Sequence, residues 1–107
     1  MNKWYLSTPM SGKTEKEIKA ALQLGIEWVK ERGDEYLYPY NPNNIVFNDN
    51  NVVEDPKPIA MLAKAIEPMD NCSGLLFIGE MAEFSKSKGC QVEMKIAEVY
   101  GLDIRII

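Results

Sequence analysis

The sequence predicts an α/β protein in which helices cover both faces of a parallel β-sheet, and three observations support this prediction. Short apolar segments alternate along the chain with longer segments of helical periodicity. The apolar segments are nearly continuous, as expected for strands buried on both faces. The connections between them are long enough for right-handed helical crossovers. We predict a three-layer protein with strand order 2-1-3-4 and a single domain over residues 1–107.

The first predicted strand is Trp4-Tyr5-Leu6-Ser7, and the Thr8–Lys13 loop that follows it is rich in residues that break regular structure. Thr14 begins a helix, since Glu17 three residues later completes a capping box. Gly33 ends this helix in the manner of a left-handed terminator. Its buried face is predicted to consist of Ile18, Leu22, Gly25 and Val29.

The second predicted strand is Tyr36-Leu37-Tyr38, which is closed by prolines. From Asn41 to Pro58 the chain is crowded with asparagine and interrupted by proline. Connections of this length in compact domains are usually lids, binding loops or disordered stretches. We therefore regard residues 43–55 as a candidate lid or intersubunit arm.

The second half of the chain repeats the alternation of helix and strand. We predict helices over Ile59–Met69 and Lys88–Tyr100, and strands over Gly74–Ile78 and Leu102–Ile107. The strand Gly74–Ile78 is the most apolar and is expected to be central in the sheet. Residues Glu80–Ser87 are expected to form a loop.

Composition excludes several classes of function. A net charge of −4 and a pI near 4.8 argue against a nucleic-acid polymer as partner, because such partners require a basic surface. Cys72 and Cys90 form neither a disulfide framework nor, without histidine, a zinc site, and we expect them to fill the core. We expect no metal, no cofactor and no membrane partner. The first residues lack a signal-peptide pattern, so we expect a cytoplasmic protein.

The predicted strand order places a ligand site where the sheet reverses its direction of growth, outside the carboxyl ends of the first and third strands. Two loops line this crevice: Thr8–Lys13 and Glu80–Lys88. Glu93 follows the second loop on the first turns of the last helix, bordering a predicted apolar stripe. The chain has no histidine, so this carboxylate is the candidate nucleophile or base. The stripe consists of Val92, Ile96, Val99 and Tyr100.

Glu93 and the first loop each have an alternative interpretation. Glu93 could instead be a helix-flank carboxylate paired with Lys88 or Lys95.

The first loop resembles a phosphate-binding site. The segment Ser7–Thr14 is one residue short of a phosphate-binding P-loop, but Ser7 replaces its first glycine and Pro9 removes an amide. A helix N-terminus that accepts one phosphate or sugar hydroxyl, or a plain strand–helix turn, fits this segment better than a nucleotide triphosphatase.

Three segments resemble landmarks of a known superfamily. Tyr5-Leu6-Ser7-Thr8-Pro9-Met10-Ser11-Gly12 is similar to the Y-[IL]-S-G-P-M-[TS]-G opening of the nucleoside 2-deoxyribosyltransferase-like superfamily, especially its small phage and bacterial members of unassigned function. Asn41-Pro42 and Gly89-Cys90-Gln91-Val92-Glu93, with Ala97, Tyr100 and Gly101 after it, resemble the other two landmarks. The likeness runs through nearly the whole chain in the right order.

The resemblance implies a flavodoxin-like fold in which Glu93 attacks the anomeric carbon of a nucleoside or nucleotide, so that an N-glycosidic bond is cleaved or transferred. It implies that the first loop lines the nucleoside pocket and that the second binds a 5′ hydroxyl or phosphate. Members of the superfamily commonly form dimers or larger assemblies, so we expect a homo-oligomer. The implied substrate-binding residues are Ser7, Pro9, Met10, Gly12, Ser85, Ser87 and Gly89.

The chain departs from the superfamily at its acidic positions. Family members that catalyse this reaction usually carry aspartates at the positions of Ala65, Ser73 and Ser87. Loss of base protonation costs about 10²–10⁴ in rate. The departures keep open a second function, in which a non-catalytic nucleotide-binding, sensing or interaction module uses the same fold.

Overall fold

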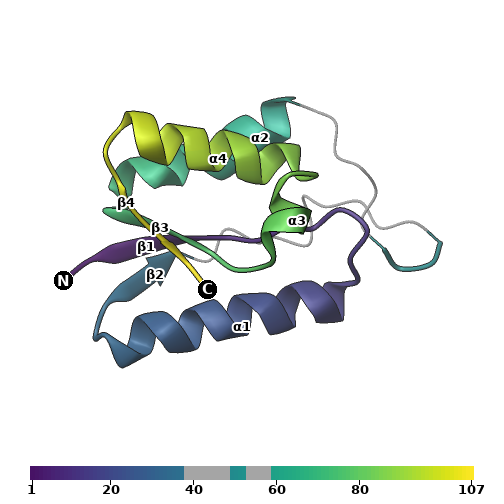
Figure 1. The fold of residues 1–107 in the computed structure, drawn as a ribbon, viewed down its shortest axis with the longest axis horizontal. Helices are drawn as coiled ribbons and strands as arrows, with labels where there is room; N and C mark the ends of the chain where they lie inside the picture. Colours follow the sequence, from purple (N-terminus) through teal and green to yellow (C-terminus); the bar gives the residue numbers. More distant parts are fainter. Residues whose placement is uncertain (38–48, 53–58) are drawn as a thin grey trace.

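The computed structural model describes residues 1–37, 49–52 and 59–107, and these form an α/β domain around a four-stranded parallel sheet (Figure 1). The strand order is β2-β1-β3-β4, with every neighbouring pair parallel, which confirms the predicted topology and fold class. The strands are β1 (Lys3–Ser7), β2 (Glu35–Leu37), β3 (Gly74–Phe77) and β4 (Asp103–Ile106).

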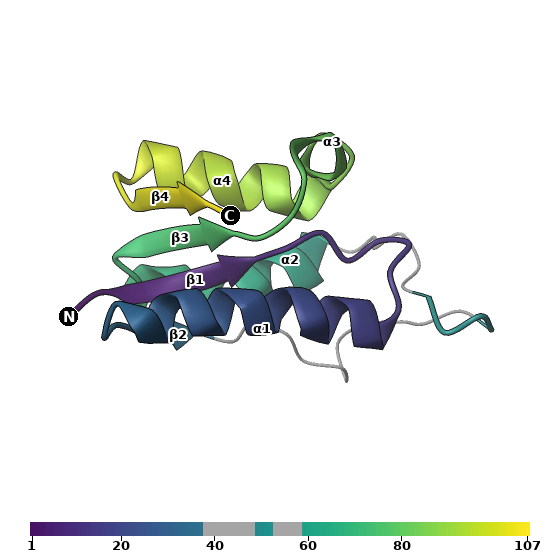
Figure 2. The ribbon, with the colours of Figure 1, turned by 60° about the horizontal axis from the view of Figure 1, so that its bottom comes forward.

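Helices cover both faces of the sheet. One face carries α1 (Glu15–Glu31), and the other carries α2 (Ile59–Ile66) and α4 (Lys88–Val99), which lie side by side in both ribbon views (Figures 1 and 2). A short helix, α3 (Met81–Phe84), lies beyond the end of β3 (Figure 2). This three-layer arrangement is consistent with a flavodoxin-like fold.

The first helix begins as the sequence predicts. The Thr14 hydroxyl accepts a hydrogen bond from the Glu17 amide at 3.2 Å, and the Glu17 carboxylate accepts one from the Thr14 amide at 3.0 Å, so both halves of the capping box are present. Gly33 follows the helix with φ of 72°, a left-handed conformation that favours glycine. The four predicted core residues of this helix are all buried.

Two of the predicted elements differ in the structure. The helix that starts at Ile59 ends at Ile66, and a 3₁₀ segment, η2 (Glu67–Asn71), continues it, because Pro68 cannot donate a backbone hydrogen bond. Part of the predicted Glu80–Ser87 loop is the helix α3. Tyr38, the Asn41-Pro42 landmark and most of the 43–55 segment lie outside the described residues. Within that segment, Val52 forms an antiparallel bridge with Thr14.

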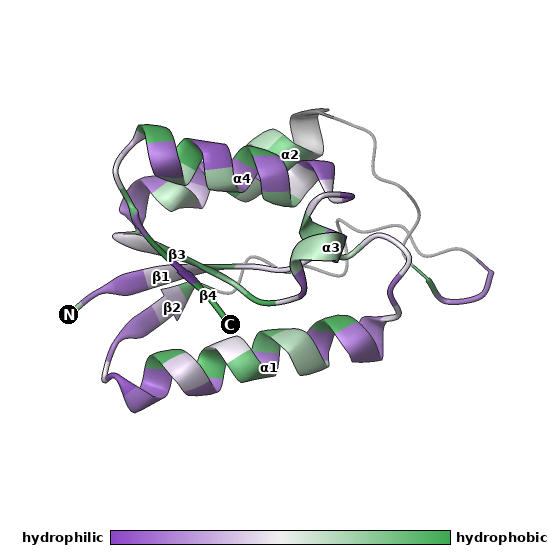
Figure 3. Ribbon diagram, in the orientation of Figure 1, coloured by the Kyte–Doolittle hydropathy of each residue, from purple (hydrophilic) through white to green (hydrophobic). Residues whose placement is uncertain are grey.

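Two apolar clusters make up the core, one on each face of the sheet. Alternate β1 and β3 residues point to opposite faces, so Leu6 and Leu76 pack under α1, whereas Tyr5, Leu75 and Phe77 pack under α4. Figure 3 shows β3 as hydrophobic over most of its length, in line with its central place in the sheet.

The predicted apolar stripe of α4 is wrong at three of its four residues, and Ile96 is the member that packs against the core. Val92, Val99 and Tyr100 are exposed, with 38%, 65% and 77% of their surface accessible. The side of α4 that faces the sheet carries Cys90, Met94 and Ala97. The sequence carries two apolar stripes on this helix, and the smaller side chains are the ones that fit against the sheet. Glu93 lies between Cys90 and Ala97 along this helix and is partly buried.

Candidate functional site

The centre of the candidate site is the contact between β1 and α4. Tyr5 and Ser7 are two residues apart on β1, so both side chains point toward α4. The Tyr5 hydroxyl lies 2.5 Å from Glu93 Oε2, and the Ser7 hydroxyl lies 2.7 Å from Glu93 Oε1. Each carboxyl oxygen of Glu93 therefore has its own hydroxyl partner. Ser7 is the last residue of β1, which places the contact at the carboxyl end of a central strand.

The Tyr5 hydroxyl has a second acceptor. It lies 2.9 Å from the carbonyl oxygen of Ala65 in α2, as well as within hydrogen-bond distance of Glu93. A phenol carries one proton, so it donates to one of the two acceptors at a time. When Glu93 is ionised, Tyr5 donates to the carboxylate. When Glu93 is protonated, its carboxyl donates to the Tyr5 oxygen and Tyr5 donates to Ala65.

Burial raises the pKa of Glu93 above the ordinary value of 4.5, and the hydrogen bonds from Tyr5 and Ser7 act against this effect. Burial and the nearby Glu93 carboxylate also raise the pKa of Tyr5, so this phenol keeps its proton. The positive end of a helix favours an ionised carboxylate on its first turns. The pKa of Glu93 is nevertheless raised, because desolvation by burial is the largest effect.

Cys90 and Ser87 extend the network along α4. The Ser7 hydroxyl lies 3.5 Å from the Cys90 Sγ atom, and the Cys90 amide donates to the Ser87 hydroxyl at 3.3 Å. Ser87 is thereby the N-cap of α4. Burial and the Glu93 carboxylate raise the pKa of the Cys90 thiol to about 11, so this cysteine is an unreactive thiol.

The other predicted site residues do not converge on Glu93. Met10 packs against the apolar cluster under α1, and Gly12 is exposed with φ of 77°. The Ser85 hydroxyl donates to the Ala82 carbonyl at 2.9 Å on the surface. Gly89 lies in the first turn of α4, facing Leu62 of α2. Among the implied substrate-binding residues, Ser7 contacts Glu93 directly, and Ser87 lies near it because its hydroxyl accepts from the Cys90 amide. The contacts given for the other residues in this paragraph are made elsewhere in the described part of the chain.

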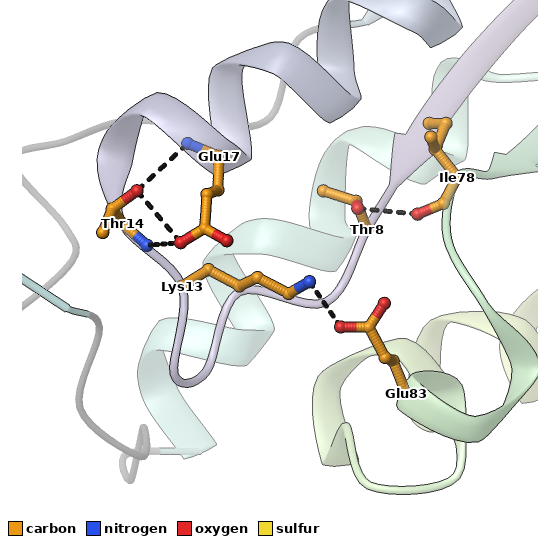
Figure 4. Close-up of polar contacts among 6 residues, drawn as sticks. All are labelled: Thr8, Lys13, Thr14, Glu17, Ile78 and Glu83. Carbon is orange, nitrogen blue, oxygen red and sulfur yellow. Dashed lines mark hydrogen bonds and ion pairs between the residues drawn. The ribbon is translucent and has the colours of Figure 1, made fainter.

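Pro9 lines a groove on the opposite face of the sheet. This groove of about 720 Å³ lies between α1 and the end of β3, and Glu93 is not among its lining residues. At its rim, Lys13 forms an ion pair with Glu83, and the Thr8 hydroxyl donates to the Ile78 carbonyl at 2.7 Å (Figure 4). The ion pair connects the two predicted site loops, Thr8–Lys13 and Glu80–Lys88, whereas the Thr8 hydrogen bond ties the first loop to the residue that follows β3.

The ion pair expected as the alternative for Glu93 is not found among the described residues. Lys95 lies 3.9 Å from Glu98 instead. Within the same residues, no group of three or more histidine, cysteine or acidic side chains is placed to hold a metal ion. None of the described helices is both long and apolar enough to cross a membrane.

Comparisons with family models, with curated proteins and with solved structures found no match for this chain.

The sequence analysis gave Tyr5 a place in the first strand but no role in the site. The ring does pack in the core, but its hydroxyl reaches Glu93. The signal was present in the alternation of β1. Tyr5 and Ser7 are the hydroxyl-bearing residues on one face of this strand, and two polar groups on a buried face require a polar partner.

Proposed function

We propose that this protein binds a nucleoside or nucleotide beside Glu93 and cleaves or transfers its N-glycosidic bond, with Glu93 as the nucleophile. The observation that carries the proposal is the pair of hydroxyls, from Tyr5 and Ser7, on the two carboxyl oxygens of Glu93. They fix a carboxylate at the carboxyl end of a central parallel strand, where α/β proteins bind ligands. The resemblance to the nucleoside 2-deoxyribosyltransferase-like superfamily assigns the same role to the same residue.

The proposed reaction has two steps. In the first, a carboxylate oxygen of Glu93 attacks C1′ of the sugar while the C1′–N bond breaks, its electron pair leaves with the base, and the base takes a proton from water. In the second, water or a second base attacks C1′ and releases the Glu93 carboxylate, with overall retention at C1′. Water gives hydrolysis, and a second base gives transfer.

The nucleophile has to be ionised, which sets the expected pH dependence. Because burial raises the pKa of Glu93, kcat/KM increases with pH until this carboxyl has lost its proton. The sugar develops positive charge in the transition state, and this charge stabilises the ionised form of Glu93 over the protonated form. Tyr5 then donates to Glu93 rather than to Ala65.

A specific observation favours a second function, nucleotide binding without turnover. Of the positions that usually carry acids in the superfamily, Ala65 offers a backbone carbonyl to Tyr5, and the Ser73 hydroxyl accepts from the Lys3 amide at 3.0 Å. Ser87 caps α4. None of these three side chains is an acid that could protonate a leaving base, so binding alone is the alternative proposal.

The P-loop reading has less support. Lys13, the residue that would contact phosphates, forms its ion pair with Glu83, and Pro9 offers no amide. A triphosphate would have to displace this ion pair (Figure 4).

The test is a product assay with a panel of nucleosides and their 5′-monophosphates, with and without a free acceptor base. Released and transferred bases are separated by chromatography. Wild type is compared with Glu93→Gln and with Glu98→Gln, a matched change on an exposed position of the same helix. We expect base release by wild type and Glu98→Gln, and a loss of at least about 10³-fold in Glu93→Gln.

The outcomes separate the two functions. Base release that survives Glu93→Gln excludes the nucleophilic role. A nucleotide that raises the melting temperature of wild type but yields no free base favours the binding module. Absence of both turnover and any thermal shift over the whole panel overturns both proposals.

A further inference from the structure

The outer edge of β4 is open in the described part of the chain. β3 is the one described strand that pairs with β4, and Figure 2 shows β4 at the edge of the sheet beside α4. The Asp103 amide donates to Ser73 and the Ile107 amide donates to Phe77, both at 3.0 Å. Successive residues of a strand direct their backbone groups to opposite sides. The N–H and C=O groups of Ile104 and Ile106 therefore point outward, away from the sheet.

The side chains at this edge divide cleanly between the two faces. Ile104 and Ile106 are in register with Leu75 and Phe77, so they lie on the face of α4, and Leu102 packs against the same cluster. Ile106 remains 51% exposed although it is apolar. The opposite face of β4 carries Asp103 and Arg105, which form an ion pair at 3.3 Å and are half exposed.

We propose that two copies of this chain associate through β4, which pairs antiparallel with β4 of the second copy about a two-fold axis at Ile104. In this register Ile104 lies opposite its own symmetry mate. The outward N–H and C=O groups of Ile104 exchange both hydrogen bonds with those of the mate, as in a hydrogen-bonded antiparallel pair. The two sheets become one continuous sheet of eight strands, twice the four strands of each copy.

The side chains favour this register over its neighbours. Asp103 of one copy lies opposite Arg105 of the other, twice, and Leu102 lies opposite Ile106, also twice. A shift of the axis by one residue toward the N-terminus places Asp103 opposite Asp103. A shift the other way places Arg105 opposite Arg105. Charges at an edge strand usually prevent pairing, but these two alternate in sign and so attract a second copy in one register.

This interface is independent of the proposed function. Tyr5 and Ser7 lie on β1, which β3 separates from β4, and the association requires no residue of the Glu93 network. Loss of base release would leave the dimer unaffected, and loss of the dimer would leave the geometry of Glu93 intact.

The experiment is sedimentation velocity over a concentration series at low ionic strength, with the full chain in four forms. Wild type is compared with Asp103→Arg, with Arg105→Asp, and with the double variant that carries both changes. Each single variant places like charges opposite each other at two positions, whereas the double variant restores unlike charges in reversed order. We expect each single variant to weaken the dimer about tenfold or more, and the double variant to recover it to within roughly threefold of wild type.

The control is Glu35→Arg, a charge reversal on β2 at the opposite edge of the sheet. We expect this variant to dimerise as wild type does, and thermal melts establish that every variant is folded. The proposal is overturned by a wild type that stays monomeric up to about 1 mM, by a double variant that does not recover, or by a control that dissociates as the single variants do.

Discussion

Glu93 combines two properties that act in opposite directions. Its two hydroxyl partners stabilise the carboxylate, whereas its burial stabilises the neutral acid, and burial is the larger effect. Burial and specific hydrogen-bond partners that together shift the pKa of a carboxyl are a pattern that clusters at functional sites. This single residue therefore makes the stability of the protein depend on pH.

The sign of that dependence follows from the direction of the shift. The pKa of Glu93 is higher in the folded protein than the 4.5 of the free side chain. The folded state therefore binds more protons than the unfolded state between these two values, and stability falls as pH rises through this range. Glu93→Gln removes the titration but keeps a side chain that both hydroxyls can bind.

We expect Glu93→Gln to be more stable than wild type at pH 8 by about 1 kcal/mol or more, and close to wild type at pH 4. Urea melts at both pH values measure the difference. Glu98→Gln, on the exposed side of the same helix, should show no such divergence. A wild type that gains stability over Glu93→Gln as pH rises would show that the carboxylate is favoured in the folded protein and would overturn the argument.

The two hydroxyls are expected to set how far the pKa of Glu93 rises. Because both stabilise the ionised carboxylate, Tyr5→Phe and Ser7→Ala should each raise the pKa of Glu93 further. Infrared difference spectra of the protonated carboxyl stretch, recorded during a pH titration, report this value directly. Ser85→Ala removes a serine hydroxyl that bonds to Ala82 and should leave the titration unchanged. A pKa that falls in Tyr5→Phe would contradict the assigned hydrogen bonds.

At the scale of elements, the close approach of β1 and β3 depends on Gly74. A Cβ atom added there would lie 2.5 Å from the ring of Trp4 and 3.0 Å from the Asp103 carbonyl, and neither can move freely. In contrast, a Cβ atom on Gly89 would lie 3.9 Å from Leu62, an ordinary contact, in the first turn of α4.

We therefore expect opposite effects from the same substitution at these two glycines. Gly74→Ala should lower the free energy of unfolding by about 1–3 kcal/mol, because the added methyl group overpacks the strand pair. Gly89→Ala should raise it by roughly 0.4–1 kcal/mol, because alanine restricts the unfolded chain more than glycine does. Chemical denaturation of the two variants beside wild type measures both changes. A stable Gly74→Ala variant would show that the Trp4 ring moves aside.

Element boundaries show where local signals suffice and where they do not. The capping box at Thr14 and the glycine terminator at Gly33 are local, and the structure has both as the sequence predicts. The buried side of α4 is not local, because two apolar stripes compete on it and only packing against the sheet decides between them. The short helix α3 was missed for a different reason, because four residues carry too little periodicity to be recognised.

At the scale of the whole molecule, the strand order brings residues from the two ends of the sequence together. Tyr5 and Glu93 are 88 positions apart in the chain, and β1 and α4 meet because β1 and β3 are central neighbours. The strand order was predictable from the alternation of elements, and Ser7 and Glu93 were both singled out from the sequence. The hydrogen bond between them, and the one from Tyr5, depend on the rotation of α4 about its axis, which sequence periodicity assigned incorrectly.

Both tryptophans of the chain, Trp4 and Trp28, lie on the α1 face of the sheet, so their fluorescence reports on one layer only. Leu75 is fully buried on the other face. If the sheet couples both layers into one cooperative unit, Leu75→Ala should destabilise the protein by about 2–5 kcal/mol, and the tryptophan signal should shift by the full amount.

The measurement is thermal unfolding followed in parallel by tryptophan fluorescence and far-ultraviolet circular dichroism. The two curves should coincide in Leu75→Ala and move together to lower temperature, because β1 and β3 belong to both layers and cannot unfold on one face alone. Leu24→Ala, at a position with 58% of its surface exposed, should change stability by no more than about 0.5 kcal/mol. A fluorescence transition that stays in place while the circular dichroism shifts would mean that the two layers unfold separately.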